Sequence, residues 1–264
     1  MGNITIGFVI ALKPKFNSKN WKNDSKLLYQ TLESICNQES EDFMAFVVYH
    51  DLPDILFNHK KIHYLKFPFS FCIFESLDKI KAEHRETPEG TTYFFDQGKK
   101  IMYGAEIAKF HNCRYIMSVD FDDLISNRIL KYITEDDNRS GYYVEKGYIY
   151  YTEKKLLLRR KKRMNGINGS TNIIYHQNIS NVDLFSNDVD SFSFFSAHYY
   201  TKFRLLEQGI VIKPLPFYAI VYRAHISNWF NIHTHMNGFS LKVIYKYLFQ
   251  RHFITKAIKK EFRL

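Results

Sequence analysis

Apolar and amphipathic segments alternate along the first half of the chain. Four apolar runs predict buried strands: residues 4–12, 43–49, 62–67 and 115–119. Apolar residues at helical spacing predict a helix that ends near Asn37 and a second helix from Lys99 to Asn112. Strands that alternate with helices in this order predict an α/β sheet with parallel strands and helices on its faces. Ligands of such sheets bind beyond the carboxyl ends of the strands.

The second half of the chain has a different pattern. Residues 141–151 are aromatic and β-prone, and a basic run follows over residues 154–163. Residues 199–208 predict a helix closed by Gly209, and two short strands are predicted after it. A Gly-rich stretch, residues 166–171, predicts a loop on the acceptor side. We find no internal repeat or low-complexity linker, which favours a single domain.

Composition narrows the class of protein without identifying it. Of 264 residues, 45% are hydrophobic, enough to build a core without disulfides or metal. The net charge of +10 favours an anionic partner: nucleic acid, a membrane surface or a phosphorylated ligand. The three cysteines lie far apart, as expected for reduced thiols in the cytosol. An uninterrupted apolar run of about 18 residues is lacking, so we expect no transmembrane helix.

An acidic cluster, Asp120-Phe121-Asp122-Asp123, directly follows the fourth apolar run. Three neighbouring carboxylates repel one another, and burial at a strand end adds a desolvation cost. A divalent cation would offset both, and carboxylate oxygens suit magnesium or manganese. Alternatively, the cluster is a solvated turn that caps the following helix. Asp51, which follows the second run, favours the first interpretation because both positions fall at strand ends.

Several of these segments together resemble family 2 glycosyltransferases of bacterial polysaccharide biosynthesis. The resemblance covers about residues 4–130 and includes residues 34–38, Asp51, residues 104–108 and the acidic motif. It implies a GT-A-like α/β domain with a Rossmann-like mixed or parallel sheet flanked by helices. We expect this domain over residues 1–240, with a nucleotide-binding half over about 1–130 and an acceptor half over about 131–240. A basic helix is expected to follow over residues 241–264.

The resemblance assigns roles to first-half residues by their match to the family motif. It implies that Asp120 contacts the nucleotide and, with Asp122, holds a divalent metal, Mn²⁺ or Mg²⁺. It also implies that Asp51 contacts the base and that Lys99 lies near the nucleotide.

The second half offers further site candidates. The resemblance implies that a histidine such as His225 completes the metal site, and Arg223 is placed to contact a phosphate. The family's catalytic base usually precedes a helix, but residues 196–197 are serine and alanine here. The remaining candidates for the base, in order, are Asp190, His198 and Asp188.

These features predict a metal-dependent, inverting glycosyltransferase. The expected donor is a nucleotide sugar linked to UDP, and the expected acceptor is a glycan or lipid-linked glycan. A phosphatase of the haloacid dehalogenase type and a basic nucleic-acid-binding protein are the alternatives, although we expect no nucleic-acid partner. The predicted location is the cytoplasm, with peripheral attachment to an anionic membrane face through the helix at 241–264. In the competing interpretation, that helix packs its apolar side against the domain.

Overall fold

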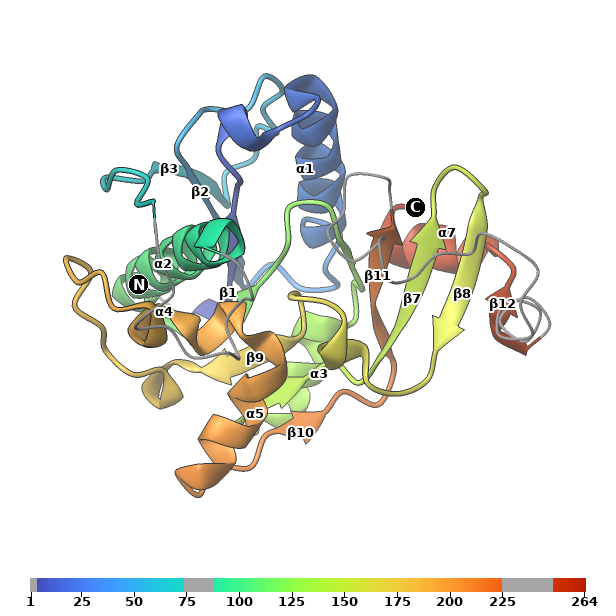
Figure 1. Cartoon of the computed structure of the whole chain (residues 1–264). Helices are drawn as coiled ribbons and strands as arrows, with labels where there is room; N and C mark the ends of the chain where they lie inside the picture. Colours follow the sequence, from blue (N-terminus) through green and yellow to red (C-terminus); the bar gives the residue numbers. More distant parts are fainter. Residues whose placement is uncertain (1–3, 74–87, 225–248) are drawn as a thin grey trace.

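A seven-stranded mixed sheet forms the centre of the fold (Figure 1). The computed structural model describes residues 4–73, 88–224 and 249–264. The strand order is β10-β6-β9-β4-β1-β2-β3. These strands are β1 (Ile4–Ala11), β2 (Phe43–Tyr49), β3 (Ile62–Lys66), β4 (Cys113–Ser118), β6 (Gly141–Tyr143), β9 (Asn172–Tyr175) and β10 (Lys213–Pro214).

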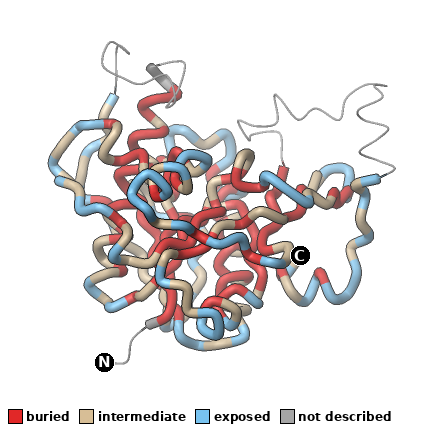
Figure 2. The backbone as a smooth tube through the Cα atoms, turned by 90° about the horizontal axis from the view of Figure 1, so that it is seen from below, coloured by how far each residue is buried: buried red, intermediate tan, exposed pale blue. Residues whose placement is uncertain are grey.

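Strands β4, β1, β2 and β3 run parallel, and helices cover both faces of this part of the sheet. Because side chains alternate along a strand, β1 sends Phe8 toward α1 (Trp21–Ile35) and Val9 toward α2 (Pro88–Phe110). Gly104 lets α2 approach closely, since a Cβ there would lie 2.4 Å from Val9 Cγ1. Figure 2 shows the most buried backbone running through these layers.

The second half extends the sheet with strands that run in both directions. Strand β9 lies antiparallel between β4 and β6, and β10 pairs in parallel with β6. Its helices are α3 (Ile129–Asp136), α4 (Val189–Ser196) and α5 (His198–Glu207). Helix α4 packs across α2, where the rings of Phe95 and Phe192 meet edge to face at 5.3 Å. The described residues also form three short 3-10 helices: η1 (Lys15–Asn17), η2 (Met164–Gly166) and η3 (His176–Asn178).

A second, five-stranded sheet combines segments that are distant in the sequence. Its strand order is β12-β8-β7-β11-β5. These strands are β5 (Leu124–Ile125), β7 (Lys146–Tyr151), β8 (Leu156–Arg160), β11 (Tyr218–Ala224) and β12 (Arg251–His252). Strand β8 lies inside the basic run, where Leu156, Leu157 and Leu158 are buried. The run is therefore not a continuous solvated segment.

The C-terminal segment differs from the expected continuous helix over residues 241–264. Residues 241–248 lie outside the described residues, strand β12 follows, and only α7 (Lys256–Phe262) is helical beyond it. Ile258 and Phe262 are buried against the second sheet, close to Tyr148. The apolar side of α7 thus packs on the domain, as the competing interpretation expected.

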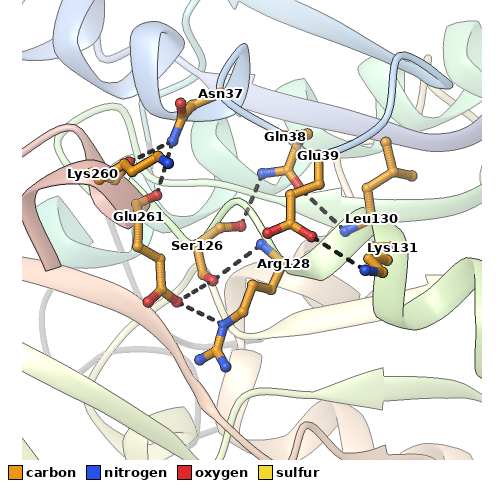
Figure 3. Close-up of polar contacts among 9 residues, drawn as sticks. All are labelled: Asn37, Gln38, Glu39, Ser126, Arg128, Leu130, Lys131, Lys260 and Glu261. Carbon is orange, nitrogen blue, oxygen red and sulfur yellow. Dashed lines mark hydrogen bonds and ion pairs between the residues drawn. The ribbon is translucent and has the colours of Figure 1, made fainter. Parts of the chain in front are cut away.

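Polar contacts also hold α7 in place (Figure 3). Ser126 Oγ donates to Glu261 Oε1 at 2.6 Å, and Arg128 Nε donates to the same oxygen at 3.0 Å. Asn37 Nδ2 donates to the carbonyl oxygen of Lys260 at 2.9 Å. The end of the chain is therefore joined to both the end of α1 and the segment after the acidic motif. None of the described helices has the length and apolarity to cross a membrane.

The predicted α/β class with a mixed sheet flanked by helices is confirmed, and this arrangement is consistent with a GT-A-like domain. The four strands of the first half fall within one or two residues of their predicted positions. The second helix begins at Pro88 rather than at Lys99, so it is about three turns longer than its apolar pattern indicated. All three cysteines are free thiols.

Candidate active site

The acidic motif lies at the carboxyl end of β4, next to the end of β1. Val119 N donates to Val9 O at 2.9 Å, and the chain then turns so that Asp123 N donates to Asp120 O at 3.2 Å. The side chains of Asp122 and Asp123 are almost fully buried. A solvated acidic turn is therefore excluded for these two residues.

Asp120 is held from both halves of the chain. Gln97 Nε2, on α2, donates to Oδ1 at 3.1 Å, and Gly169 N donates to Oδ2 at 3.2 Å. Burial, together with the charge of Asp122, raises the pKa of Asp120 to about 7, although these two donors oppose the rise. A Cβ at Gly169 would lie 2.7 Å from Asp120 Oδ2, so only glycine fits against this carboxylate.

Asp123 connects the motif to the Gly-rich loop, residues 166–171. Asn168 Nδ2 donates to Asp123 Oδ2 at 2.6 Å, and Ser170 Oγ donates to the same oxygen. Burial and the charges of Asp120 and Asp122 raise the pKa of Asp123 well above its usual range. Its buried Oδ1 has no hydrogen-bond partner among the described residues. The third carboxylate of the motif therefore fixes the loop, and the loop shapes the surroundings of Asp120.

Arg223, for which a phosphate contact is predicted, is buried beside the acidic motif. Its side chain is 3% exposed, and its guanidinium binds protein groups around α1 and the motif. Nε donates to the carbonyl oxygen of Asp122, and Nη2 donates to Leu27 O at 2.9 Å and to Thr31 Oγ1 at 3.0 Å. Burial lowers the pKa of Arg223 to about 10, although the two nearby aspartates oppose this shift. Arg223 therefore anchors the acidic motif to α1.

Lys99, for which a place near the nucleotide is predicted, is a second buried cation. It is 5% exposed, and its ammonium donates to Ser186 O at 3.0 Å. The same ammonium lies over the rings of Phe69, at 4.6 Å, and Phe192, at 5.3 Å. Lys99 thus belongs to the contact between α2 and α4. Gln97, two residues earlier on α2, is the side chain that reaches the motif, and sequence reasoning missed it because the helix was expected to start later.

A buried ionic cluster near the ends of β1 and β2 was also missed. Lys100 Nζ contacts Asp96 Oδ2 at 2.6 Å and donates to Leu12 O at 2.6 Å. His50 Nε2 hydrogen-bonds to Asp96 Oδ1, also at 2.6 Å. Burial lowers the pKa of Lys100, while Asp96 opposes that shift. The Lys99-Lys100 pair was the available signal, but only the helix orientation shows which lysine faces the strand ends.

Asp51 and Asp120 lie at the same edge of the sheet. Asp51 follows β2 and Asp120 follows β4, and β1 pairs in parallel with both strands. Two strand spacings correspond to roughly 10 Å. Asp51 Oδ2 accepts a hydrogen bond from Lys15 N at 2.8 Å, which joins it to the loop after β1. The predicted cleft position at this edge is therefore consistent with the topology.

The three candidate bases lie at different places. Asp188 is exposed and caps α4, where it accepts hydrogen bonds from Asp190 N at 3.2 Å and Ser191 Oγ at 2.6 Å. Asp190 lies in the first turn of α4, and His198 begins α5 beyond the other end of that helix. Asn172 Nδ2 donates to the carbonyl oxygen of His198 at 3.0 Å. Because Asn172 directly follows the Gly-rich loop, this hydrogen bond joins the backbone of His198 to the end of that loop.

A complete protein-derived metal site is not present in the described part of the chain: no three His, Cys, Asp or Glu side chains there are grouped to hold an ion. His225 lies outside the described residues. Asp120 and Asp122 still supply hard oxygen ligands, and their mutual repulsion in a buried place favours a cation. The donor set fits a divalent ion whose coordination is completed by oxygens of a bound ligand.

Comparisons with known proteins show only distant likeness. The chain matches no family model and no curated protein. It is similar to crystal structures of TarS from S. aureus. For TarS 1-349 the identity is 12% and the TM-score 0.44, over 83% of this chain and 60% of that one. For TarS the identity is 12% and the TM-score 0.45, over 83% of this chain and 37% of that one. For TarS 1-349 in complex with UDP-GlcNAc the identity is 11% and the TM-score 0.43, over 84% of this chain and 59% of that one. The chain thus spans at most about 60% of these structures, and likeness at this level assigns no function.

Proposed function

We propose that this protein is a glycosyltransferase that uses a nucleotide-sugar donor, with UDP-sugars as the first class to test. The observation that carries the proposal is the position of Asp120 and Asp122 at the end of a central parallel strand. Asp51 lies at the same edge, where α/β sheets bind their ligands. The acceptor we propose is a hydroxyl group of a glycan or lipid-linked glycan.

In this proposal, residues at the ends of two strands contact different parts of the donor. Asp51 contacts the nucleoside, while Asp120 and Asp122 hold Mg²⁺ or Mn²⁺ together with the diphosphate. The cation would supply positive charge that stabilises the departing nucleoside diphosphate. Gln97 and Gly169 orient Asp120 by donating to its two oxygens. His225 remains a candidate for a further ligand.

His198 is the candidate base in an inverting displacement. Such a reaction needs a group that removes the proton from the attacking hydroxyl, and imidazole is suited to this near neutral pH. The position where the resemblance places a carboxylate holds Ser196 and Ala197, which are buried at the junction of α4 and α5. His198 is the next residue, it is partly exposed, and it is tied to the Gly-rich loop through Asn172. Asp190 is the second choice.

We also propose that the enzyme works in the cytoplasm and attaches peripherally to an anionic membrane face. Because the apolar side of α7 is buried, attachment through α7 itself would be electrostatic. It depends on the exposed lysines of α7, such as Lys256 and Lys259. Such attachment would bring the site close to lipid-linked acceptors.

The function is tested by comparing Asp122→Asn with Asp54→Asn, which removes a half-exposed acid outside the motif. Purified protein is incubated with a panel of UDP-sugars and Mn²⁺, and stabilisation on thermal shift and release of UDP are measured. We expect donor-dependent stabilisation in the wild type and in Asp54→Asn. In Asp122→Asn it should be lost, with at least about a 100-fold drop in UDP release.

Two outcomes would contradict the proposal. The first is unchanged donor binding in Asp122→Asn. The second is release of inorganic phosphate instead of UDP, which would favour a phosphatase. A nucleic-acid shift assay on the same samples tests the remaining alternative.

A further inference from the structure

A cavity of about 460 Å³ lies between α2, α4, α5 and residues 180–182. Its volume falls within the roughly 300–1,000 Å³ that is typical of small-molecule sites. Helix α5 lines it with Tyr200, Phe203, Arg204 and Glu207, which recur at i, i+3, i+4 and i+7 and so share one face. Met102 forms part of the wall on the α2 side. The site proposed for the donor does not involve this face of α5.

The lining of this cavity combines flat apolar surfaces with hydrogen-bonding groups. Tyr200 and Phe203 are 37% and 39% exposed, so parts of their rings are open to a ligand. Asp190, Glu207 and Arg204 also line the cavity, and Arg204 Nη1 donates to Ser193 Oγ at 2.8 Å. A sugar ring has an apolar face that can stack on an aromatic ring and hydroxyl groups that bind carboxylates and guanidinium. Two acids and one base would not favour a strongly anionic ligand.

Residues of both α4 and α5 line the cavity, although His198 itself is not part of the lining. Phe194 and Tyr200, both in its lining, flank His198 in the sequence. Thr201 Oγ1 donates to the carbonyl oxygen of Phe194 at 2.6 Å, and Asn172 Nδ2 donates to Thr201 Oγ1 at 3.3 Å. These contacts fix the junction against the strand that follows the Gly-rich loop. A chain molecule with one end near His198 could therefore continue along α5.

We propose that this cavity is a carbohydrate subsite that binds the glycan part of the acceptor, beyond the hydroxyl that reacts. The inference rests on the proposed function, because it assigns the substrate class to a second part of the same enzyme. It also assigns Asp190 to hydroxyl binding in the subsite.

The subsite is tested by saturation-transfer NMR on the full chain without donor. The probes are β-1,4-linked N-acetylglucosamine oligomers and α-1,4-linked glucose oligomers of one to six units. We expect at least one series to bind with an affinity that rises with chain length. Phe203→Ala should weaken binding roughly three- to tenfold, as expected for loss of one stacked ring. The matched control is Leu206→Ala, which removes a 56% exposed side chain of α5 that does not line the cavity and should leave binding unchanged.

The proposal is overturned if neither series binds, or if Phe203→Ala and Leu206→Ala have equal effects. Analytical ultracentrifugation provides a further test, because a dimer that Phe203→Ala converts to monomer would identify the face as an interface between copies of the chain. Donor binding, measured separately by thermal shift, distinguishes the two proposals. Intact donor binding without glycan binding rejects only the subsite, whereas glycan binding without UDP release rejects only the transferase.

Discussion

The two halves of this domain differ in how their strands find partners. In the first half, β1, β2 and β3 follow one another in the sequence and pair side by side. In the second half, β9 lies between β4 and β6, and β11 lies between β7 and β5. The first half is therefore built largely from local pattern, whereas the second depends on contacts between distant segments. Each half therefore has its own role in the proposed site.

The first half supplies the acidic groups, and the second half controls their surroundings. Asp120 and Asp122 come from the parallel sheet, but Gly169 and Asn168 from the Gly-rich loop bury the motif. Arg223, on β11, anchors the same motif to α1. The two halves are thus coupled at the place where the chemistry is proposed.

Arg223→Met should lower the free energy of unfolding by about 3–5 kcal/mol, because it leaves several buried acceptors without their charged donor. Chemical denaturation measures this change. Arg139→Met, at an exposed position, is the control and should stay within about 0.5 kcal/mol of the wild type. Unchanged stability with weaker donor binding would instead restore the role of Arg223 as a phosphate contact.

Gly169→Ala should lower the free energy of unfolding by about 1–3 kcal/mol. The added Cβ would lie 2.7 Å from Asp120 Oδ2 and push the loop away from the motif. The stabilisation of this variant by a bound donor should also be weaker than that of the wild type. Gly166→Ala, in the same loop, is the matched control, since its Cβ would lie 3.6 Å from the Tyr199 ring. Equal urea midpoints for the two variants would show that the loop does not press on Asp120.

The pH dependence of stability should reveal the buried acids. The pKa of Asp120 is raised from 3.8 to about 7, so between these values the folded state keeps a proton that the unfolded chain has lost. Raising the pH through this window therefore lowers the free energy of unfolding, by at most about 1.4 kcal/mol per pH unit for one proton. Asp120→Asn should reduce this slope when metal is absent.

Urea unfolding between pH 4.5 and pH 7.5 measures that slope. Asp54→Asn is the control and should keep the slope of the wild type, because Asp54 is 46% exposed. Identical slopes in all three proteins would contradict the raised pKa of Asp120.

Removal of one basic residue from α7 is expected to weaken membrane attachment only modestly. Lys259→Gln should weaken partition onto phosphatidylserine-containing liposomes about fivefold, since one basic residue near such a surface contributes about 1 kcal/mol. Lys60→Gln removes an exposed lysine near β3 and serves as the control. Binding to neutral liposomes with equal affinity would exclude an electrostatic role for α7.

Sequence reasoning predicted the α/β class and the place of the acidic motif, because both depend on local periodicity. It also placed Asp51 and Asp120 at one sheet edge, since parallel strands carry their carboxyl ends together. It did not predict the protein contacts of Lys99 and Arg223, whose charge suggested a ligand, and their ligand roles stay predictions. Charge is visible in the sequence, but the groups that satisfy it, such as Ser186 and Thr31, are brought in by folding.

The order of strands and helices in the first half, and with it the acidic end of β4, can be predicted from the amino-acid pattern alone. Apolar alternation and helical spacing act over a few residues, so they can be identified without knowledge of the fold. Only the tertiary structure decided which side chains meet that end. Gln97 depends on the orientation of α2, and Gly169 lies 49 positions from Asp120. Contacts over such separations arise from packing between elements, for which no local pattern exists.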